Sequence, residues 1–232
     1  MRGYTRERKF VGSSVGFDLC LDILNHYCLS DPRHSVGIIE SIYFDDHKFS
    51  AYWDKADGSG LKRKHRIRWY PGTGLLPDSK TQAFLEVKNR IGSARDKDRM
   101  AFAARRSLLE TADLHDPVIQ SLLYENAAAA RINLPADLVP TVSIRYHRHR
   151  FVCPHSGSRI CLDTNLHIGR INGDVLQDSG QITTDAVVCE IKSPTHIEWE
   201  WTGCLFRAGF KLRSFSKYGQ FMHAILNGGF SE

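Results

Sequence analysis

The sequence predicts an α+β protein of mostly antiparallel strands, with helices between them and one at the C-terminal end. Two observations predict this class. Short runs of alternating or β-favouring residues recur along the chain, and a few longer stretches repeat apolar residues at helical spacing. No stretch rich in proline, glycine and serine divides the 232 residues, so a single domain spanning 1–232 is expected.

The strands are predicted from the alternation of apolar and polar residues, because alternate side chains of a strand face opposite sides of its sheet. A segment with several prolines and glycines, residues 71–78, is typical of the loop of a hairpin, and residues 171–181 of another connecting loop. The expected strands are residues 4–10, 36–44, 62–70, 82–90, 141–152, 158–166 and 185–192.

Four helices are predicted from apolar residues spaced three or four apart. Ser13 or Ser14 is expected to cap the first, which runs to about Cys28. Residues 98–110 and 117–130 are expected to form a helical insertion between strands. Residues 214–226 are expected to form the last helix, with its apolar side chains on one stripe.

The composition excludes several classes of protein. With 42% hydrophobic and 25% charged residues and a net charge of +5, the chain is neither disordered nor a coiled coil. No run approaches the ~18 apolar residues of a membrane span, and the start lacks the apolar run of a signal peptide, so a cytoplasmic protein is expected. The six cysteines lack zinc-site spacing and are expected to be reduced and structural.

Charged residues two positions apart recur on the predicted strands, and such residues share one face. For one strand, a charged face is usually the solvent face. The repetition favours a curved sheet that turns these faces inward, where the cations must be paired or meet an anion. A chain of phosphates fits, because Arg offers a bidentate fork and Lys a point charge. The pairs are Glu7/Lys9, Arg66/Arg68, Glu86/Lys88, Arg148/Arg150 and Glu190/Lys192.

The glutamates of these pairs have two interpretations. Glu7, Glu86 and Glu190 either form ion pairs with their neighbours or hold a divalent cation that bridges phosphate oxygens, as Mg²⁺ and Mn²⁺ do. The approach to the last helix, from Lys211 to Lys217, contains cations and serines but no acid. That composition is typical of an anion site at a helix start, and a simple serine cap explains it equally well.

Eight short motifs match one known family in order, and the resemblance covers nearly the whole chain. The chain resembles the VTC (vacuolar transporter chaperone) domain, the polyphosphate polymerase branch of the triphosphate tunnel metalloenzymes. This resemblance implies a β-barrel-like tunnel of antiparallel strands with flanking helices. The motifs are Arg6-Glu7-Arg8-Lys9-Phe10, Ser41-Ile42-Tyr43-Phe44-Asp45-Asp46, Arg66-Ile67-Arg68, Phe84-Leu85-Glu86-Val87-Lys88, Tyr146-His147-Arg148, Leu162-Asp163, Glu190-Ile191-Lys192 and Ser214-Phe215-Ser216-Lys217-Tyr218.

The resemblance also implies roles for individual residues. Those implied to be catalytic are Arg66, Arg68, Lys88, Arg148 and Lys217. Those implied to bind the phosphate chain are the same five with Lys9, Arg99, Tyr146, Arg159, Lys192 and Ser216. Glu190 is the implied metal-binding carboxylate, with Glu7 and Glu86 as further candidates.

Two positions depart from the wider pattern. Thr5 stands where the superfamily signature Glu-x-Glu-x-Lys has its first glutamate, which favours the VTC branch over relatives that are adenylate cyclases or thiamine triphosphatases. Ser214 stands where the polymerase pattern has a lysine, and Arg213 and Lys211 are the nearest replacements.

The implied reaction transfers the terminal phosphate of ATP, or of another nucleoside triphosphate, to a growing inorganic polyphosphate with Mn²⁺ or Mg²⁺. The acceptor is an ionised phosphate oxygen, so catalysis would consist of positioning and charge neutralisation. A metal-dependent tripolyphosphatase or triphosphatase, with Glu7 or Glu86 activating water, is one alternative, and a non-catalytic polyphosphate-binding module is another. No nucleic-acid partner is expected, because the basic run 145–150 carries no known fingerprint. A membrane partner protein stays open.

Three further groups have a structural and a functional interpretation. His147 and His149 alternate with Arg148, so they are expected on the opposite face, and no third zinc ligand is apparent. Trp199 and Trp201 are expected to pack a helix against the sheet, with stacking on adenine as the alternative. Asp45-Asp46 is expected to form a turn.

Overall fold

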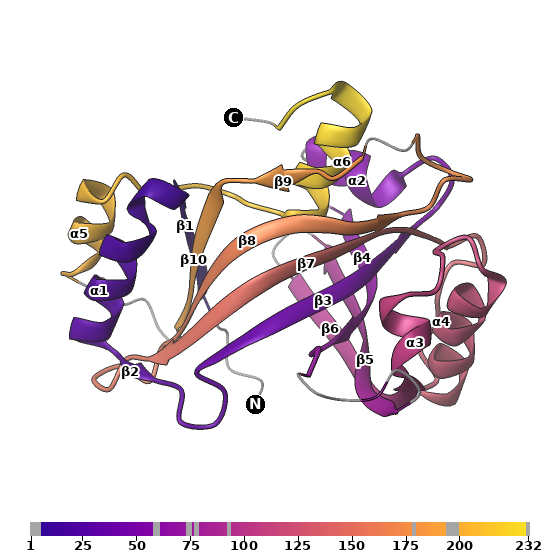
Figure 1. Cartoon of the computed structure of the whole chain (residues 1–232), viewed down its shortest axis with the longest axis horizontal. Coiled ribbons are helices and arrows are strands. Elements are labelled where there is room, and N and C mark those ends of the chain that lie inside the picture. Colours follow the sequence, from indigo (N-terminus) through magenta and orange to yellow (C-terminus); the bar gives the residue numbers. More distant parts are fainter. Residues whose placement is uncertain are drawn as a thin grey trace. The chain divides into compact units, whose positions relative to one another are not determined.

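The computed structural model describes residues 6–57, 61–72, 76, 79–91, 94–177, 180–193 and 200–230 (Figure 1). Thr5 and Trp199, which the sequence singles out, lie outside these residues. In the described ranges, no helix reaches the length and apolar character that crossing a bilayer would require.

The chain alternates between strands and short helices. The strands are β1 (Arg6–Ser13), β2 (Leu29–Ser30), β3 (Val36–Asp45), β4 (Leu61–Trp69), β5 (Lys80–Ile91), β6 (Ala94–Arg105), β7 (Val139–Val152), β8 (Arg159–Ile171), β9 (Thr183–Thr184), β10 (Ala186–Ser193) and β11 (Lys211–Leu212). The helices are η1 (Ser14–Gly16), a 3-10 turn, and α1 (Phe17–Tyr27), α2 (Ser50–Ala56), α3 (Arg106–Glu110), α4 (Pro117–Ala129), α5 (Thr202–Arg207) and α6 (Lys217–Asn227).

The strands form one mostly antiparallel sheet, which confirms the α+β class. Its order is β11-β1-β10-β8-β7-β3-β4-β5-β6, with β2 paired to β7 and β9 to β8. The sheet has two ends, β11 and β6, and over the described residues it is not closed into a barrel. The expected barrel-like closure is therefore wrong. The outer edge of β1, where a closing strand would pair, is occupied at Phe10 and Val11 by the two-residue strand β11.

The chain divides into two compact units. Unit 1 comprises Met1–Ile38, Tyr146–Leu166 and Thr183–Ser216, and unit 2 comprises Ile39–Arg145, His167–Ile182 and Lys217–Glu232. Each unit has a sheet face that is apolar and covered by helices. The single-domain expectation stays a prediction.

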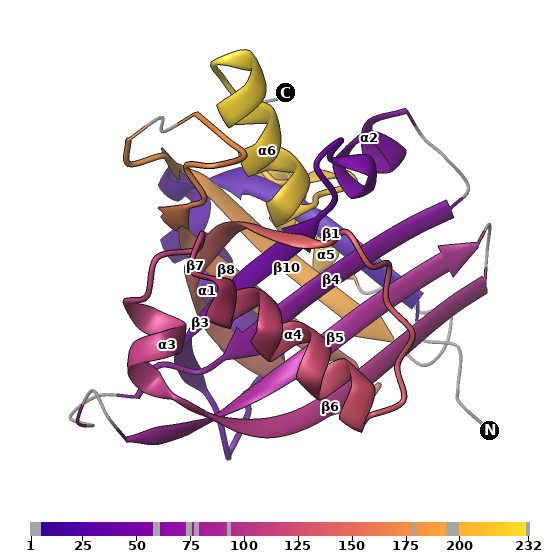
Figure 2. The same cartoon turned by 90° about the vertical axis from the view of Figure 1, so that its right-hand side faces the viewer.

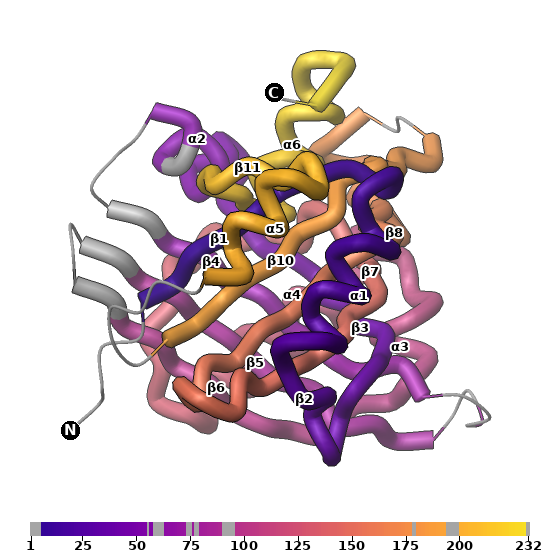
Figure 3. The backbone as a smooth tube through the Cα atoms, turned by 90° about the vertical axis from the view of Figure 1, so that its left-hand side faces the viewer, coloured from indigo at the N-terminus to yellow at the C-terminus, as the bar shows by residue number. Residues whose placement is uncertain are grey.

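In unit 1 the helices α1 and α5 lie over β1 and β10 (Figure 3). Cys189 and Ile191 of β10 are buried against Leu24 of α1 and Leu205 of α5. Because side chains alternate along a strand, the residues between them, among them Glu190, lie on the opposite, polar face.

In unit 2 the helix α4 crosses the sheet beside β5 (Figure 2). Leu123 of α4 is buried with Ile67 of β4 and Leu85 of β5. The same alternation therefore places Arg66 and Glu86 on the face of this part of the sheet that lies opposite α4.

One predicted helix is wrong. Residues 98–105 belong to β6, which pairs with β5 from Ala94 to Arg105, and only Arg106–Glu110 is helical. Met100 and Phe102 pack on the unit 2 core from this strand. Pairing with β5 and burial of this apolar face decide the outcome, although the alanines of the segment favour a helix.

The sequence also missed the short helices α2 and α5. The expected turn at Asp45-Asp46 is present, and it also starts α2, because Asp45 accepts hydrogen bonds from the backbone of Ala51 and Tyr52. Trp201 packs in the unit 1 core at the start of α5 and stacks on Tyr27 of α1 with ring centroids 6.4 Å apart.

Candidate functional site

The polar face of β4, β5 and β6 in unit 2 gathers cations around one buried carboxylate. Arg66, Glu86 and Arg99 lie side by side in the registers of the two strand pairs. Two residues along, and so on the same face, Lys64, Lys88 and Lys97 lie side by side in the same way. Glu86 retains only 2% of its surface exposed. A buried carboxylate is stable only when it is paired, so its partners define this site.

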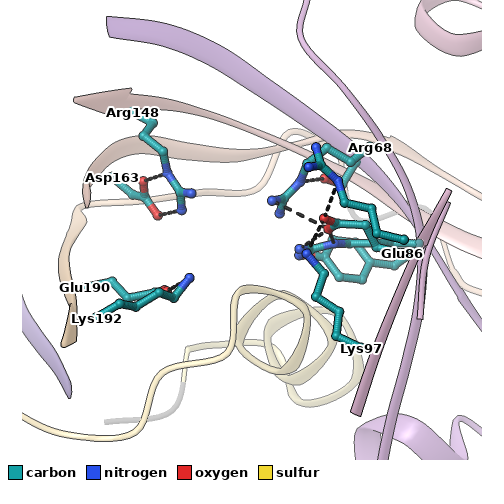
Figure 4. A network of polar contacts seen from close by, with 11 residues as sticks. Arg68, Glu86, Lys97, Arg148, Asp163, Glu190 and Lys192 are labelled. Carbon is teal, nitrogen blue, oxygen red and sulfur yellow. Dashed lines mark hydrogen bonds and ion pairs between the residues drawn. The ribbon is translucent and has the colours of Figure 1, made fainter. Parts of the chain in front are cut away.

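Four cations contact Glu86, and Figure 4 shows Arg68 and Lys97 directed at its carboxylate. The Arg66 Nε donates to Oε2 at 2.8 Å, and the Lys97 Nζ donates to Oε1 at 2.7 Å. Arg68 NH1 lies 3.7 Å from Oε2, and Arg99 Nε lies 3.4 Å from Oε1. Burial alone would raise the pKa of Glu86, but Arg66, Arg68 and Lys97 hold it well below its ordinary value. One ionised carboxylate thus fixes four cations and leaves this face positive.

The start of α6 adds a fifth cation to the unit 2 face, Lys217. Its neighbour Tyr218 anchors the helix, because the Tyr218 hydroxyl donates to Asp45 Oδ2 at 2.7 Å. The Tyr218 ring stacks on that of Tyr43, with centroids 5.2 Å apart. The charges of Arg66, Arg68 and Lys217 all act on the Tyr43 hydroxyl. Three cations therefore act on one phenol, and Arg66 is in direct contact with it.

A second charged group lies on β1 and β10 in unit 1. Glu7 is paired in register with Lys192, and Lys9 with Glu190, so the signs alternate both along and across the two strands. The Lys9 Nζ is 3.1 Å from Glu7 Oε1 and 3.9 Å from Glu190 Oε2. The Lys192 Nζ is 2.7 Å from Glu190 Oε1. Burial opposes ionisation of Glu190, yet Lys192, Lys9 and Arg148 hold its pKa well below the usual range.

The strands β7 and β8 contribute an arginine with a fixed geometry. Arg148 donates to both oxygens of Asp163, from Nε at 2.6 Å and from NH2 at 2.7 Å (Figure 4). Its guanidinium also lies over the Tyr146 ring, 5.3 Å from the centroid. Burial alone would lower the pKa of Arg148, and the Asp163 carboxylate raises it above its ordinary value. The guanidinium is therefore charged and held in one orientation.

A comparison against known protein families identifies the family of this chain. The family model of the VTC domain matches residues 6–226. The chain belongs to the VTC domain family. The matched range runs from β1 to α6 and includes both charged groups of this VTC domain.

Other comparisons with this VTC domain found only distant likeness. No curated protein matches it significantly in sequence. A Vibrio parahaemolyticus protein proposed to be an adenylate cyclase has 11% identity and a TM-score of 0.48, over 93% of this chain and 97% of that one. The PH1012 protein of Pyrococcus horikoshii has 12% identity and a TM-score of 0.40, over 87% of each chain. Similarities this low do not establish a shared fold or activity.

The residues singled out from the sequence fall into these two groups of the VTC domain. In unit 2 the structure brings together Arg66, Arg68, Glu86, Arg99 and Lys217, with Lys88 two residues from Glu86 on the same face of β5. In unit 1 it brings together Glu7, Lys9, Tyr146, Arg148, Glu190 and Lys192, with Arg159 opposite Lys192 on β8. Their functional roles stay predictions.

The segment before α6 is divided between exposed and buried residues. Ser216 is buried, whereas Ser214, Lys211 and Arg213 are exposed. The carbonyl of Phe215 accepts a hydrogen bond from Lys9 Nζ at 2.9 Å, which ties this segment to β1. Ser214 is exposed and uncharged, so it does not supply the positive charge that a lysine would bring to this position.

Sequence reasoning missed Lys97, Tyr43, Asp45 and Tyr218 as members of the site. Lys97 was hidden by the helix predicted over 98–110, since only a strand puts it on the same face as Arg99. The three others lie inside motifs that support the family resemblance. Their contribution follows from their contacts with one another and with Arg66.

The histidines beside Arg148 lie on the other face of β7. The His149 ring meets that of Phe17 on α1, with centroids 5.7 Å apart. His147 and His149 line a cavity of about 360 Å³ next to this helix, together with Asn165 and Asp185. In the parts of the chain that the structure describes, no three His, Cys, Asp or Glu residues come together as a set of metal ligands.

A metal site built from few protein ligands fits part of this VTC domain. Mg²⁺ is commonly held by one or two carboxylates and completes its shell with water and phosphate oxygens. Glu190 and Glu7 suit that role, because they lie on one face of neighbouring strands and the Glu190 carboxylate is held ionised. Glu86 suits it less well, because four cations contact its carboxylate, whereas two lysines contact that of Glu190.

Proposed function

We propose that this VTC domain is a polyphosphate polymerase, which transfers the terminal phosphate of ATP to the end of an inorganic polyphosphate. The observation that carries the proposal is the face around Glu86, where four contacting cations exceed the charge of the single carboxylate by three. Arg66 and Arg68 are mostly buried there, whereas Lys97 and Arg99 reach solvent, and an anion from solvent would balance the excess positive charge. A chain of phosphates supplies negative charge at regular spacing along its length.

The arginines supply geometry as well as charge. Arg66 is held by Glu86 and Arg148 by Asp163, so each guanidinium is oriented before a ligand arrives. A planar fork that is already oriented binds phosphate oxygens at a lower entropic cost than a free side chain. Lys88 and Lys217 add point charges to the unit 2 face, and Lys9 and Lys192 to the unit 1 face.

The chemistry requires no covalent nucleophile from the protein. The attacking group is an ionised phosphate oxygen, and the barrier comes from positioning and from the negative charge on the transferring phosphoryl group. The arginines and lysines stabilise that charge. When bound, Mg²⁺ or Mn²⁺ held by Glu190 and Glu7 supplies further neutralisation of phosphate oxygens.

The test is incubation of the purified protein with ATP and MnCl₂, followed by a gel stained for polyphosphate. We expect a ladder that disappears in Arg66→Ala, because losing one well-placed cation of this kind typically costs ~3–4 kcal/mol of transition-state stabilisation. Lys48→Ala removes an exposed cation outside both charged groups and should keep the ladder. Absence of polymer from the unmodified protein would overturn the proposal.

Hydrolysis of tripolyphosphate is the second candidate, and one observation favours it. The Glu7 side chain retains 25% exposure, so a water molecule can reach a carboxylate able to accept its proton. Release of inorganic phosphate from tripolyphosphate, with no polymer formed from ATP, would support hydrolysis. Tight binding of polyphosphate without turnover of either substrate would instead support a binding module.

A further inference from the structure

Tyr43 occupies a special position on the unit 2 face. It is the register partner of Arg66 across the β3–β4 pair, and its side chain is on the side of the sheet that carries Glu86. Only 4% of its surface is exposed. A buried phenol normally satisfies both its oxygen and its proton, so its partners can be examined in turn.

The oxygen of the Tyr43 hydroxyl is satisfied by the protein. Arg66 NH1 donates a hydrogen bond to it at 3.2 Å, and the guanidinium carbon lies 5.8 Å from the ring centroid. Arg68 and Lys217 are close enough that their charges act on the same hydroxyl. Burial would raise the pKa of Tyr43, but these cations lower it below its ordinary value.

The proton of the Tyr43 hydroxyl has no hydrogen-bond acceptor among the described residues. Within the described residues, the hydrogen bond from Arg66 is the one that this hydroxyl makes, and there it is the acceptor. The side chains of Arg66, Arg68 and Lys217 carry donors and cannot accept the proton. No side chain around the hydroxyl accepts this proton, so it is available to water or to an oxygen of a ligand, and the surrounding charge favours an anionic ligand.

The ring is also held in one place. The Tyr43 ring stacks on that of Tyr218 at an interplanar angle of 16°, and the Tyr218 hydroxyl is fixed by Asp45. Thr141 Oγ1 donates to the Tyr43 carbonyl at 3.0 Å, which fixes the backbone. The hydroxyl therefore meets a ligand without first losing conformational freedom.

We propose that Tyr43 contacts the substrate and donates a hydrogen bond from its hydroxyl to a phosphate oxygen of the ligand that Arg66, Arg68 and Lys217 attract. This inference rests on the proposed function for the phosphate nature of the ligand. It adds a neutral donor to a set of cations. A neutral donor gives direction to the phosphate without adding to the repulsion among the positive groups.

The test compares the affinity for tripolyphosphate, by titration calorimetry at pH 7, of the unmodified protein, Tyr43→Phe and Tyr124→Phe. Tyr43→Phe keeps the stacked ring and removes one donor to a charged acceptor, so we expect the Kd to rise about tenfold or more. Tyr124→Phe is the matched control, since it removes a phenol hydroxyl that donates to Pro135 on the helix side of unit 2, at 2.7 Å. Its Kd should change less than about twofold, a shift below the size of one such bond.

A second measurement needs no variant. Tyrosine absorbance is followed during alkaline titration of the unmodified protein, with and without tripolyphosphate. A phosphate acceptor stabilises the protonated phenol, so the tyrosine that ionises earliest should ionise at higher pH when ligand is bound. Equal Kd values for Tyr43→Phe and the unmodified protein, or a titration that ligand leaves unchanged, would overturn the role of Tyr43. Intact binding of tripolyphosphate without polymer synthesis would overturn the polymerase proposal alone.

Discussion

Arg148 and Asp163 form a bidentate pair in unit 1 whose carboxylate is completely buried, with N–O distances of 2.6 and 2.7 Å. The buried charge of Asp163 is tolerated because the Arg148 guanidinium donates to both of its oxygens. Removing either side chain alone leaves the other buried and uncompensated, a change that typically costs 3–5 kcal/mol. The pair thus links the orientation of one proposed phosphate-binding arginine to the stability of unit 1.

We expect Asp163→Asn to lower the free energy of unfolding by about 3 kcal/mol, because Arg148 loses its ionised acceptor. Urea denaturation at pH 7 measures the change. The double variant Arg148→Met with Asp163→Leu removes both charges, and it should recover most of the lost stability. A double variant that is less stable than Asp163→Asn would contradict this explanation.

Neutralising Glu190 and neutralising Glu86 should have different effects on the Mn²⁺ concentration that polymer synthesis requires. If Glu190 holds the metal, Glu190→Gln raises the Mn²⁺ concentration needed for half-maximal polymer synthesis by about tenfold or more, a usual size for weakening a metal site. Glu86→Gln should lower activity with little change in that concentration, because Glu86 positions cations. Equal shifts in the two variants would show that both carboxylates contact the metal, or that neither does.

Glu40 should make the stability of unit 2 depend on pH. It is 4% exposed, and burial raises its pKa from 4.5 to about 7, against the opposing charges of Arg170 and Arg145 and with a small contribution from Glu110. The folded protein therefore keeps a proton that the unfolded chain releases between these two values. The contribution of this proton to stability is fully present below pH 4.5 and is lost as the pH rises through 7, by roughly 3 kcal/mol for a shift of this size.

The measurement is urea denaturation of the unmodified protein and Glu40→Gln at pH 5 and pH 8. Glutamine has nearly the same shape and no proton to lose, so the variant should lose less stability than the unmodified protein over this interval. Parallel pH profiles for the two proteins would mean that Glu40 does not titrate in this range.

The six cysteines should differ sharply in reactivity. All are free; Cys20, Cys28, Cys153 and Cys189 are buried, and Cys161 and Cys204 are partly exposed. Burial raises the pKa of Cys28 to about 12 and also raises that of Cys161, so their reactive thiolates are scarce at pH 8. We expect one fast thiol in the native protein, Cys204, when it is treated with a coloured disulfide reagent.

Six thiols should react after denaturation, and Cys204→Ser should remove the fast phase from the native protein. A fast phase that persists in this variant would place the accessible thiol elsewhere. Reaction of all six in the native protein would mean that the unit 1 core opens readily.

The strands could be predicted where apolar residues on one face alternate with charged residues on the other. In β10, Val187, Cys189 and Ile191 alternate with Val188, Glu190 and Lys192, so a period of two identifies the strand and its charged face together. The segment 94–105 has charged residues in its first half and alanines in its second, which favour a helix locally. Its structure is decided by pairing with β5, the strand that precedes it in the chain, and the propensity of the segment taken alone does not report that pairing.

The sequence predicts which charged residues of the site share a face, but it does not predict which of them contact one another. Spacing placed Arg66 and Arg68 on one face, which the register with β5 confirms. It could not reveal that Glu86 is shared among four cations, because this depends on β6 lying beside β5. Nor does any local pattern distinguish Tyr43, which faces Arg66, from an aromatic residue that packs in a core.

The open end of the sheet at β6 has a consequence for solubility. In the described chain this strand pairs on one side only, with β5, so the peptide groups along its other side are available to any extended segment that comes near. Asp96, Lys97, Asp98 and Arg99 follow one another along that strand. A second molecule could add a strand here only by stripping water from four successive charges. Charged residues along this edge strand therefore oppose pairing between the sheets of two molecules, so the open edge need not cause aggregation.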